Sequence, residues 1–368
     1  MKKILILTIT EGHVSIAQAI KKSLENSFQT EVIAYTFKEF NLYLPMYQLF
    51  PALFKIPYKL SQYKAMQELS TGFFLKKYGA ELESIIAEEQ PDALVSTYAL
   101  YDIVCTKYAK EHHIPVFNAL ANPRTIHPLE ICENSTKNLV FDDEAYSTLV
   151  NFGIPRSQIL KTGWFVRPSF QPARSKEKLR KELGLKPEML TYLISGGSDG
   201  TGMVVKILPL LFQVNTPLQI IFITGNNKSL YKSLQFFKKS FDMANKNSPI
   251  HIKVFGFVAN MHEYMAASDL VIGKAGPNSL FESVAVHTPF FAITHISGQE
   301  DGNLELISEY KLGYVEENPL KAIKMLKAIA EHPKKLSYFH KSIQLMADYN
   351  HQAGEQLRTV INTAIHKT

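Results

Sequence analysis

The chain has 368 residues, which is long for a single hydrophobic core and comfortable for two domains. Apolar residues make up 46% and charged residues 20% of the sequence, and this balance excludes an intrinsically disordered chain. A formal net charge of +6 fits an anionic membrane surface or a nucleic acid, but it is too modest to select either.

The two cysteines, Cys105 and Cys132, show no metal-ligand spacing, and we expect both to be buried thiols in a reducing cytosol. The sequence has no uninterrupted apolar run near the ~20 residues that span a bilayer. We therefore expect a cytoplasmic protein whose membrane contact is peripheral.

The first predicted element is a buried strand over residues 4–8. Its apolar run is about seven residues long, has no small-residue cleavage site and ends at Glu11, so it predicts a strand rather than a signal peptide. A turn through Gly12 leads to a helix whose apolar positions are Ile16, Ala17, Ala19, Ile20 and Leu24. A lone histidine is usually structural, but His13 follows a first strand, where doubly wound sheets bind ligands.

Residues 35–78 interleave aromatic side chains with lysines, and Pro45, Pro51 and Pro57 exclude one long helix through the segment. One interpretation is an interfacial segment with rings at headgroup depth and ammonium groups on anionic lipid. The other is a helical insertion that packs its aromatics against the first domain. The candidates for membrane contact are Tyr43, Tyr47, Phe50, Phe54, Lys55 and Lys59. No nucleic-acid-binding motif accompanies them, so we exclude a nucleic-acid partner.

Further strands are predicted over residues 93–96, 116–120 and 138–141, with helices between them. Asp142 and Asp143 follow the last of these strands, and we expect them to cap a helix that begins at Glu144. A proline-containing, charged stretch over residues 168–186 reads as the connection between domains, with the boundary near residue 170.

The second half repeats this pattern. A strand over residues 190–195 precedes Gly196-Gly-Ser-Asp-Gly200 and a helix through residues 204–208. Later strands are predicted over residues 219–224, 252–255, 270–273 and 290–294. Alternating strands and helices in both halves predict an α/β fold with two parallel, doubly wound sheets.

The most informative motif is Lys274-Ala-Gly-Pro-Asn-Ser-Leu-Phe-Glu282, which follows a buried strand. We expect the chain to turn at Gly276 and Pro277 into a helix capped by Asn278 or Ser279. Such a turn directs unpaired backbone N–H groups and the positive helix end at one place, which suits a diphosphate. Glu282, one turn into the helix, can accept hydrogen bonds from vicinal hydroxyls such as those of a ribose.

The strand over residues 290–294 leads to Gly298-Gln-Glu-Asp-Gly-Asn303. The amide of Gln299 and the carboxylate of Glu300 could hold the hydroxyls of a sugar, whereas Asn303 either contacts the ligand or orients the loop. An ordinary strand–turn–helix with coincidental polar residues is the simpler interpretation of the glycine and proline alone. The whole set in register favours a sugar-nucleotide site.

These motifs resemble the donor site of the GT-B glycosyltransferases that include monogalactosyldiacylglycerol synthases and processive diacylglycerol glucosyltransferases. The peptidoglycan N-acetylglucosaminyltransferase is more distantly similar. The resemblance covers nearly the whole chain and includes Pro91-Asp-Ala-Leu-Val-Ser-Thr-Tyr98, Thr162-Gly-Trp-Phe-Val-Arg-Pro-Ser-Phe170 and Gly256-Phe-Val-Ala-Asn-Met-His262. It implies two Rossmann-like domains facing a central cleft, over residues 1–170 and 171–325, with helices over 326–368 that return to the first domain.

The resemblance also assigns donor-binding residues. The leaving diphosphate would be stabilised by Gly196, Gly197 and Ser198 with Gly276, Pro277 and Ser279 opposite. Glu282 would hold the ribose, Phe257 and Val258 would flank the uracil, and Gln299 and Glu300 would hold the sugar.

His13 matches the histidine of the family's Gly-Gly-Gly-His turn, which contacts the donor phosphate or acts near the acceptor. Thr10-Glu11-Gly12-His13 has one glycine where relatives have two or three, and Glu11 adds a negative charge near the proposed diphosphate. Glu11 could itself be the catalytic base. His127 lies in a loop that in relatives carries an aspartate and a histidine. Here Asn122, which cannot act as a base, replaces the aspartate, and His127 remains a candidate acceptor-side residue.

The resemblance implies an inverting, metal-independent transferase that moves glucose or galactose from UDP-glucose or UDP-galactose to a lipid, diacylglycerol above all. The nucleotide sugar would be a substrate, and no cofactor is expected. A glycolipid synthase must take its acceptor from a bilayer, which favours docking of residues 35–78 on the anionic inner face of a membrane. The alternatives are a GT-B transferase with another acceptor, a sugar-nucleotide epimerase, which would not need the aromatic and basic insertion, and a non-catalytic binder of UDP-sugar or lipid.

Overall fold

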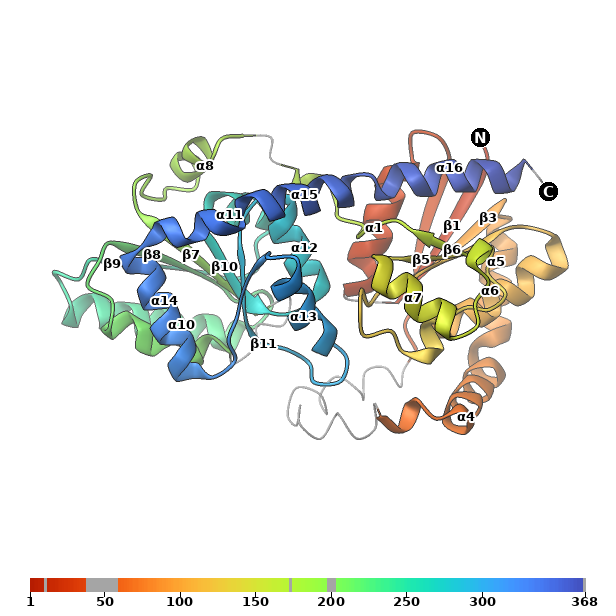
Figure 1. The fold of residues 1–368 in the computed structure, drawn as a ribbon, viewed down its shortest axis with the longest axis horizontal. Coiled ribbons are helices and arrows are strands. Elements are labelled where there is room, and N and C mark those ends of the chain that lie inside the picture. The colour runs from red at the N-terminus through yellow and green to blue at the C-terminus, as the bar shows by residue number, and fades with distance from the viewer. Residues whose placement is uncertain (10–11, 38–58, 172–173, 197–202, 367–368) are drawn as a thin grey trace. The chain divides into compact units, whose positions relative to one another are not determined.

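The computed structural model describes residues 1–9, 12–37, 59–171, 174–196 and 203–366. Its contacts divide the chain into two units. The first comprises Met1–Pro168, Ser297–Gly302 and Tyr349–Thr368, and the second comprises Ser169–Ile296 and Asn303–Asp348. Each unit contains one parallel sheet of six strands flanked by helices (Figure 1), so the predicted α/β class with two doubly wound sheets is confirmed.

The sheet of the first unit has the order β2-β1-β3-β4-β5-β6. Its strands are β1 (Lys3–Thr8), β2 (Gln29–Ala34), β3 (Ala93–Ser96), β4 (Val116–Ala119), β5 (Lys137–Val140) and β6 (Ile159–Lys161). Its helices include α1 (Gly12–Leu24), α4 (Lys64–Phe74), α5 (Ala80–Glu89), α6 (Ala99–His112) and α7 (Asp143–Asn151). The apolar positions predicted for α1 are its buried ones, because they recur at the helical period and form one face.

The sheet of the second unit has the order β12-β11-β10-β7-β8-β9. Its strands are β7 (Leu190–Ser195), β8 (Leu218–Ile223), β9 (Ile250–Phe255), β10 (Leu270–Lys274), β11 (Phe290–Thr294) and β12 (Gly313–Val315). Its helices include α8 (Lys176–Glu182), α9 (Met203–Ile207), α10 (Lys228–Ala244), α11 (Met261–Ala267), α12 (Pro277–Ala285), α13 (Asp301–Glu309) and α14 (Pro319–Glu331). The strands β8 and β10 are buried almost throughout, since helices cover both faces of the sheet.

Sequence analysis missed three strands, β2, β6 and β12, and each lies at the edge of its sheet. β6 and β12 are only three residues long, and β2 begins with the three polar residues Gln29, Thr30 and Glu31, so that only its second half is apolar. An edge strand is covered on fewer sides than a central one, so it needs no continuous apolar run to be stable. The apolar-run criterion therefore detected mainly the central strands.

The C-terminal helices differ from the expected arrangement. The tail was expected to return to the first domain from residue 326, but residues up to Asp348 belong to the second unit. The reason is that α14 packs into the second core through Ile323 and Leu326, and Tyr192 Oη donates to the Leu326 carbonyl at 2.8 Å. Only the end of α15 (His340–His351) and α16 (Ala353–Ile365) belong to the first unit, where α16 lies beside α1 (Figure 1).

Within the described ranges, no helix is both long enough and apolar enough to cross a membrane. Cys105 and Cys132 are both buried and unpaired with each other, as expected.

Candidate functional site

In the second unit the predicted donor-binding turns lie at the place where the strand order reverses. β7 and β10 are neighbours, while their sequence-adjacent strands β8 and β11 lie on opposite sides. Gly196 follows β7 and Gly276 follows β10, so both glycines lie at the carboxyl edge of this switch point, where open α/β sheets bind ligands. The two strands approach closely, because a Cβ atom on Gly273 would lie 3.1 Å from the Ser195 carbonyl oxygen.

The helix after β10 begins earlier than the sequence indicated. Neither Asn278 nor Ser279 is its cap: Gly276 occupies the N-cap and Pro277 the first helical position. Proline is favoured there because its fixed φ suits a helix and its missing N–H needs no partner. The first-turn N–H groups of α12 have no acceptor within the helix, and they lie at the positive end of its dipole.

Glu282 lies one turn further along α12 and is 8% exposed. Asn303, on α13, is 1% exposed, and its Nδ2 donates to the Ala275 carbonyl at 2.8 Å. This hydrogen bond holds the backbone immediately before Gly276. Asn303 thus holds the turn after β10, and its contact with the ligand stays a prediction.

The segment with Gln299 and Glu300 is ordered by its own backbone. Gly298 has φ +92°, and its N–H is accepted by Asp301 Oδ1 at 2.7 Å. Gln299 is half-buried, whereas Glu300 is buried. Residues 297–302 were expected in the second domain, but their contacts place them in the first unit, where the Gly302 N–H donates to Thr125 Oγ1 at 2.9 Å.

Phe257 and Val258 follow β9, at the same carboxyl edge of the second sheet as Gly196 and Gly276. The Phe257 ring is 69% exposed and Val258 is half-buried. An aromatic ring that is largely exposed at the ligand edge of a sheet is available to a planar base.

In the first unit the strand order reverses between β1 and β3, and His13 lies at that switch point. Thr8 ends β1 and Thr97 follows β3, and the Thr97 hydroxyl donates to Thr8 Oγ1 at 2.7 Å. His13, in the first turn of α1, places its Nδ1 2.6 Å from the Thr97 carbonyl oxygen. Its ring also meets Tyr98 edge-on, with 5.4 Å between the ring centroids.

These contacts define the protonation of His13. A carbonyl oxygen only accepts, so Nδ1 carries the hydrogen and, in the neutral ring, Nε2 presents a lone pair. Burial lowers the pKa of His13 below 6.5, and this outweighs the hydrogen bond to Thr97, which acts in the opposite direction. The ring is therefore neutral near pH 7, and Nε2 can accept a proton.

Glu130 is a residue that sequence analysis missed, and it organises the loop that contains Asn122 and His127. Its Oε1 accepts from Asn122 Nδ2, and its Oε2 accepts from the His127 N–H at 3.2 Å. Burial raises the pKa of the Glu130 carboxyl to about 7, although both donors favour its ionised form. The available signal was the spacing of His127 and Glu130, three residues apart as in a capping box.

The His127 side chain is held by contacts within the first unit. It is buried, its Nδ1 accepts from the Leu129 N–H at 3.1 Å, and its Nε2 lies 2.9 Å from Ser61 Oγ. Both ring nitrogens therefore have partners within the first unit. Burial lowers the pKa of His127.

The neighbouring Asp142 has the capping role that was predicted for it. Its Oδ1 accepts from the Ala145 N–H at 2.9 Å, and α7 begins at Asp143, one residue before the expected start. Asp142 also binds buried Arg124, whose Nε lies 2.8 Å from Oδ2. The pair attaches the loop of Asn122 to the start of α7.

Within the described part of the aromatic segment over residues 35–78, some side chains pack in the core and others are exposed, so each of the two interpretations fits a part of it. Tyr35, Phe37, Phe74 and Tyr78 pack with Tyr98 and Tyr101 in the first core. In contrast, α4 and the turn before it expose an apolar stripe formed by Leu60, Tyr63, Met66, Leu69 and Phe73. Lys59 is exposed beside this stripe, and Lys77 Nζ lies 5.5 Å from the centroid of the Phe73 ring.

Eight of the predicted site residues lie outside the described residues: Glu11, Gly197, Ser198, Tyr43, Tyr47, Phe50, Phe54 and Lys55. In the part of the chain that is described, no three His, Cys, Asp or Glu side chains gather closely enough to hold a metal ion.

Two family profiles match the chain, one for each half. Residues 13–166 match "Monogalactosyldiacylglycerol (MGDG) synthase", and residues 191–351 match "Glycosyltransferase family 28 C-terminal domain". A processive diacylglycerol beta-glucosyltransferase of Bacillus pumilus is 25% identical over 96% of this chain and 95% of its own length. A probable chloroplastic monogalactosyldiacylglycerol synthase of Glycine max is 28% identical over 68% of this chain and 47% of its own length.

Solved structures share the fold. MurG of Acinetobacter baumannii superposes with a TM-score of 0.67 at 16% identity, covering 99% of this chain and all of its own. HepE of Anabaena in complex with UDP and glucose superposes with a TM-score of 0.58 at 15% identity, covering 100% of both chains. These likenesses, with two doubly wound units and the two half-chain matches, establish the GT-B fold. Over both of its halves the chain is therefore similar to the GT-B glycosyltransferases that include the monogalactosyldiacylglycerol synthases and the processive diacylglycerol glucosyltransferases.

Proposed function

We propose that this protein transfers glucose or galactose from a UDP-sugar to the hydroxyl of diacylglycerol at the inner face of a membrane. The transfer would invert the anomeric centre and would need no metal ion. The observation that carries the proposal is the agreement between the family matches and the residues at the two switch points, His13 on the first unit and the Gly276 turn on the second.

The second unit would bind the donor. The N-terminus of α12 would stabilise the diphosphate as negative charge develops on the leaving group, and the buried Glu282 would accept hydrogen bonds from the ribose. Phe257 would lie against the uracil, and Gln299 and Glu300 would hold the sugar. Charge stabilisation by backbone N–H groups and a helix dipole is the physical basis for transfer without a metal ion.

The first unit would activate the acceptor. His13 Nε2 would remove the proton from the acceptor hydroxyl while its oxygen attacks the anomeric carbon and the nucleoside diphosphate leaves. The hydrogen bond to Thr97 would hold the ring in the required tautomer and stabilise the positive charge that the ring gains. Glu11, the other candidate base, lies outside the described residues.

The exposed stripe of α4 would bring the first unit to the bilayer. Tyr63 is 66% and Leu69 67% exposed. A protein surface rarely exposes a row of large apolar side chains unless they bind a partner. With the lysines around it, the stripe matches the composition of an interfacial helix.

The direct test is transfer of radiolabelled sugar from UDP-glucose and from UDP-galactose, in separate reactions, to diacylglycerol in anionic vesicles with a chelator present. A labelled glycolipid from one donor supports the reaction, identifies the sugar and shows that no divalent metal is needed. Product that forms only after a divalent metal is restored would contradict the metal independence.

The remaining alternatives are separated by the same reactions. A labelled product on a different lipid would keep the transferase and overturn the diacylglycerol acceptor. Conversion of the donor to another UDP-sugar would indicate an epimerase. UDP binding in calorimetry, with neither transfer nor conversion, would indicate a non-catalytic binder.

A further inference from the structure

Helix α10 of the second unit is amphipathic in an unusual way, because its solvent side carries large apolar side chains. Leu234 and Phe241 anchor its inner face in the second core. On the other side Phe236 is 75% and Met243 61% exposed. Neither side chain contributes to the proposed donor site, which lies at the carboxyl edge of the sheet.

Lysines surround these two apolar side chains. At 3.6 residues per turn, Lys232 and Lys239 share one face with Phe236 and Met243, and all four are exposed. From residue 228 to residue 246 the sequence contains five lysines and a single acidic residue, Asp242. Asp242 is occupied by Lys238, with 2.6 Å between Nζ and Oδ2.

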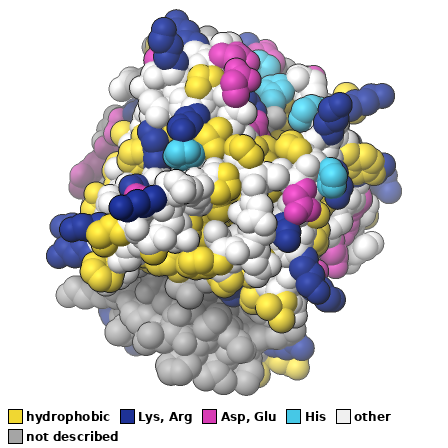
Figure 2. All heavy atoms as spheres, turned by 90° about the vertical axis from the view of Figure 1, so that its left-hand side faces the viewer, with side chains coloured by type: hydrophobic (Ala, Val, Ile, Leu, Met, Phe, Trp, Pro, Cys, Tyr) yellow, Lys and Arg dark blue, Asp and Glu magenta, His cyan; other side chains and the backbone are white. Residues whose placement is uncertain are grey.

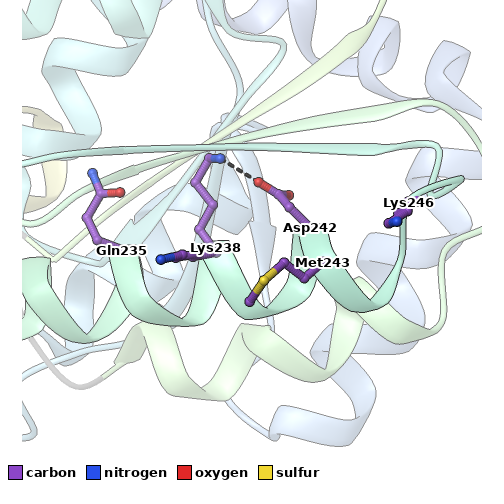
Figure 3. Close-up of a pocket in the computed structure, with 6 residues that line it drawn as sticks. Gln235, Lys238, Asp242, Met243 and Lys246 are labelled. Atoms are coloured by element: carbon purple, nitrogen blue, oxygen red, sulfur yellow. Dashed lines mark hydrogen bonds and ion pairs between the residues drawn. The ribbon is translucent and has the colours of Figure 1, made fainter.

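The face also contains a hollow at the C-terminal end of α10 (Figure 3). Its volume is about 350 Å³, and it is lined by Gln235, Lys238, Lys239, Asp242, Met243 and Lys246. Figure 2 views the molecule from the side on which β9 and α10 lie in Figure 1, and it shows Lys and Arg side chains interspersed with hydrophobic ones.

We propose that this face of α10 is a docking surface for anionic phospholipid, with the lysine-lined hollow receiving a headgroup phosphate. Single apolar side chains surrounded by lysines suit a bilayer surface, because the apolar side chains enter the headgroup region while the ammonium groups remain at the phosphates. A protein partner fits less well, because lysine is depleted in the cores of protein interfaces.

This docking surface rests on the proposed function only in that both involve a membrane. It is a separate surface, since α10 belongs to the second unit and the stripe of α4 to the first. It adds a second attachment, made by the unit that would bind the donor. A failed transfer reaction would not contradict this docking surface, because lipid binding is measured without donor or acceptor.

The test is flotation of the full-length protein with vesicles of phosphatidylcholine alone and with added phosphatidylglycerol. We expect the double variant Lys232→Gln/Lys239→Gln to bind anionic vesicles roughly 25-fold more weakly, since each lysine near an anionic surface contributes about fivefold. Lys232→Arg/Lys239→Arg should retain binding. In Phe236→Trp, the new indole fluorescence should shift to the blue with anionic vesicles only.

Lys321→Gln/Lys324→Gln on α14 is the matched control, because it removes the same charge from exposed positions of the same unit. An equal loss of binding in this control, or unchanged binding in the α10 variant, would overturn the proposal. An indole fluorescence in Phe236→Trp that shifts only when a protein partner is added would also overturn it.

Discussion

At His13, one hydrogen bond determines which ring nitrogen carries the proton. Nδ1 is occupied by the Thr97 carbonyl, and the lowered pKa leaves Nε2 unprotonated at neutral pH. The sequence identified this residue by its place after the first strand, but the tautomer depends on Thr97, which lies 84 residues away.

Replacing His13 by glutamine should reduce kcat by about 10²–10⁴-fold, the usual contribution of a general base. The wild-type rate should fall only below pH 6.5, because the lowered pKa keeps His13 in its basic form above that value. The pH–rate profile from acid to neutral pH measures both effects.

In the variant the acid limb should disappear, while UDP affinity by calorimetry stays within about threefold, or ~0.7 kcal/mol. A large loss of UDP affinity with an unchanged pH profile would instead assign His13 to donor contact. His366→Ala, at an exposed position far along the chain, should behave as wild type.

The role of Glu282 can be tested with the ligand as well as the protein. Glu282→Gln should weaken UDP binding roughly 10- to 150-fold, because a hydrogen bond to a charged group contributes about 1.5–3 kcal/mol. Deoxyuridine diphosphate should bind the variant and the wild type alike. Calorimetry of both ligands with wild type and Glu282→Gln measures the coupling between the carboxylate and the ribose hydroxyl, and the exposed Glu305→Gln is the control. An equal loss of affinity for both ligands in Glu282→Gln would rule out a ribose contact.

Glu130 should make stability depend on pH. Its folded pKa is raised to about 7, so between its ordinary value and 7 the folded state holds a proton that the unfolded chain has released. The free energy of unfolding should therefore fall as pH rises through this window.

The free energy of unfolding should be higher at about pH 5 than at about pH 8, and Glu130→Gln should reduce this difference by about 2 kcal/mol. Urea unfolding at both pH values measures it, and comparing the two cancels any pH-independent loss of a hydrogen bond. Glu133→Gln, exposed on the same loop, is the control. A wild-type pH dependence that survives in Glu130→Gln would show that the carboxyl is ionised in the folded protein.

At the scale of elements, α12 illustrates how local chemistry positions a ligand site. Proline at its first position and glycine at its cap start the helix directly after β10, so the first-turn N–H groups lie at the switch point of the sheet. Asn303 then holds the preceding carbonyl from another helix. The sequence predicted the helix, but the start depends on the proline geometry rather than on the polar caps that follow it.

Helix α4 should attach the first unit to lipid. Leu69→Ser/Phe73→Ser should lower binding to anionic vesicles by at least tenfold, because burying one large apolar side chain contributes about 1.5–3 kcal/mol. Vesicle flotation is the measurement. Phe152→Ser, which removes a comparably exposed ring from the same unit, should leave binding unchanged, and an equal effect there would contradict docking through α4.

At the scale of the whole molecule, the first unit is completed by the last residues of the chain. Asn350 Oδ1 accepts from the Trp164 N–H at 2.8 Å, and Leu357 and Ile361 are fully buried. Gly354 lies against α1 so closely that a Cβ atom there would be 2.4 Å from Ser23 Cβ. The fold of this unit therefore depends on a contact between its first and last helices.

Gly354→Ala should lower the free energy of unfolding by about 1–3 kcal/mol, the usual cost of overpacking. Gly72→Ala on α4 is the matched control: a Cβ there meets nothing within 4 Å, so the better helix propensity of alanine should raise stability by about 0.5–1 kcal/mol. Denaturant unfolding measures both. Stabilisation by both substitutions would show that α16 does not pack this closely on α1.

The sequence by itself determined the central strands and the helices between them, the two doubly wound sheets and the placement of the glycine turn after β10. These features follow from apolar periodicity and turn chemistry, which act over a few neighbouring residues. Tertiary structure alone decided that Glu130 binds Asn122, that Tyr78 is buried while Phe73 is exposed, and that the C-terminal tail joins the first unit from Tyr349 rather than from residue 326. Each of these depends on how the chain packs in space, because burial and hydrogen-bond partners are set by what lies against a side chain and not by apolar periodicity or turn chemistry.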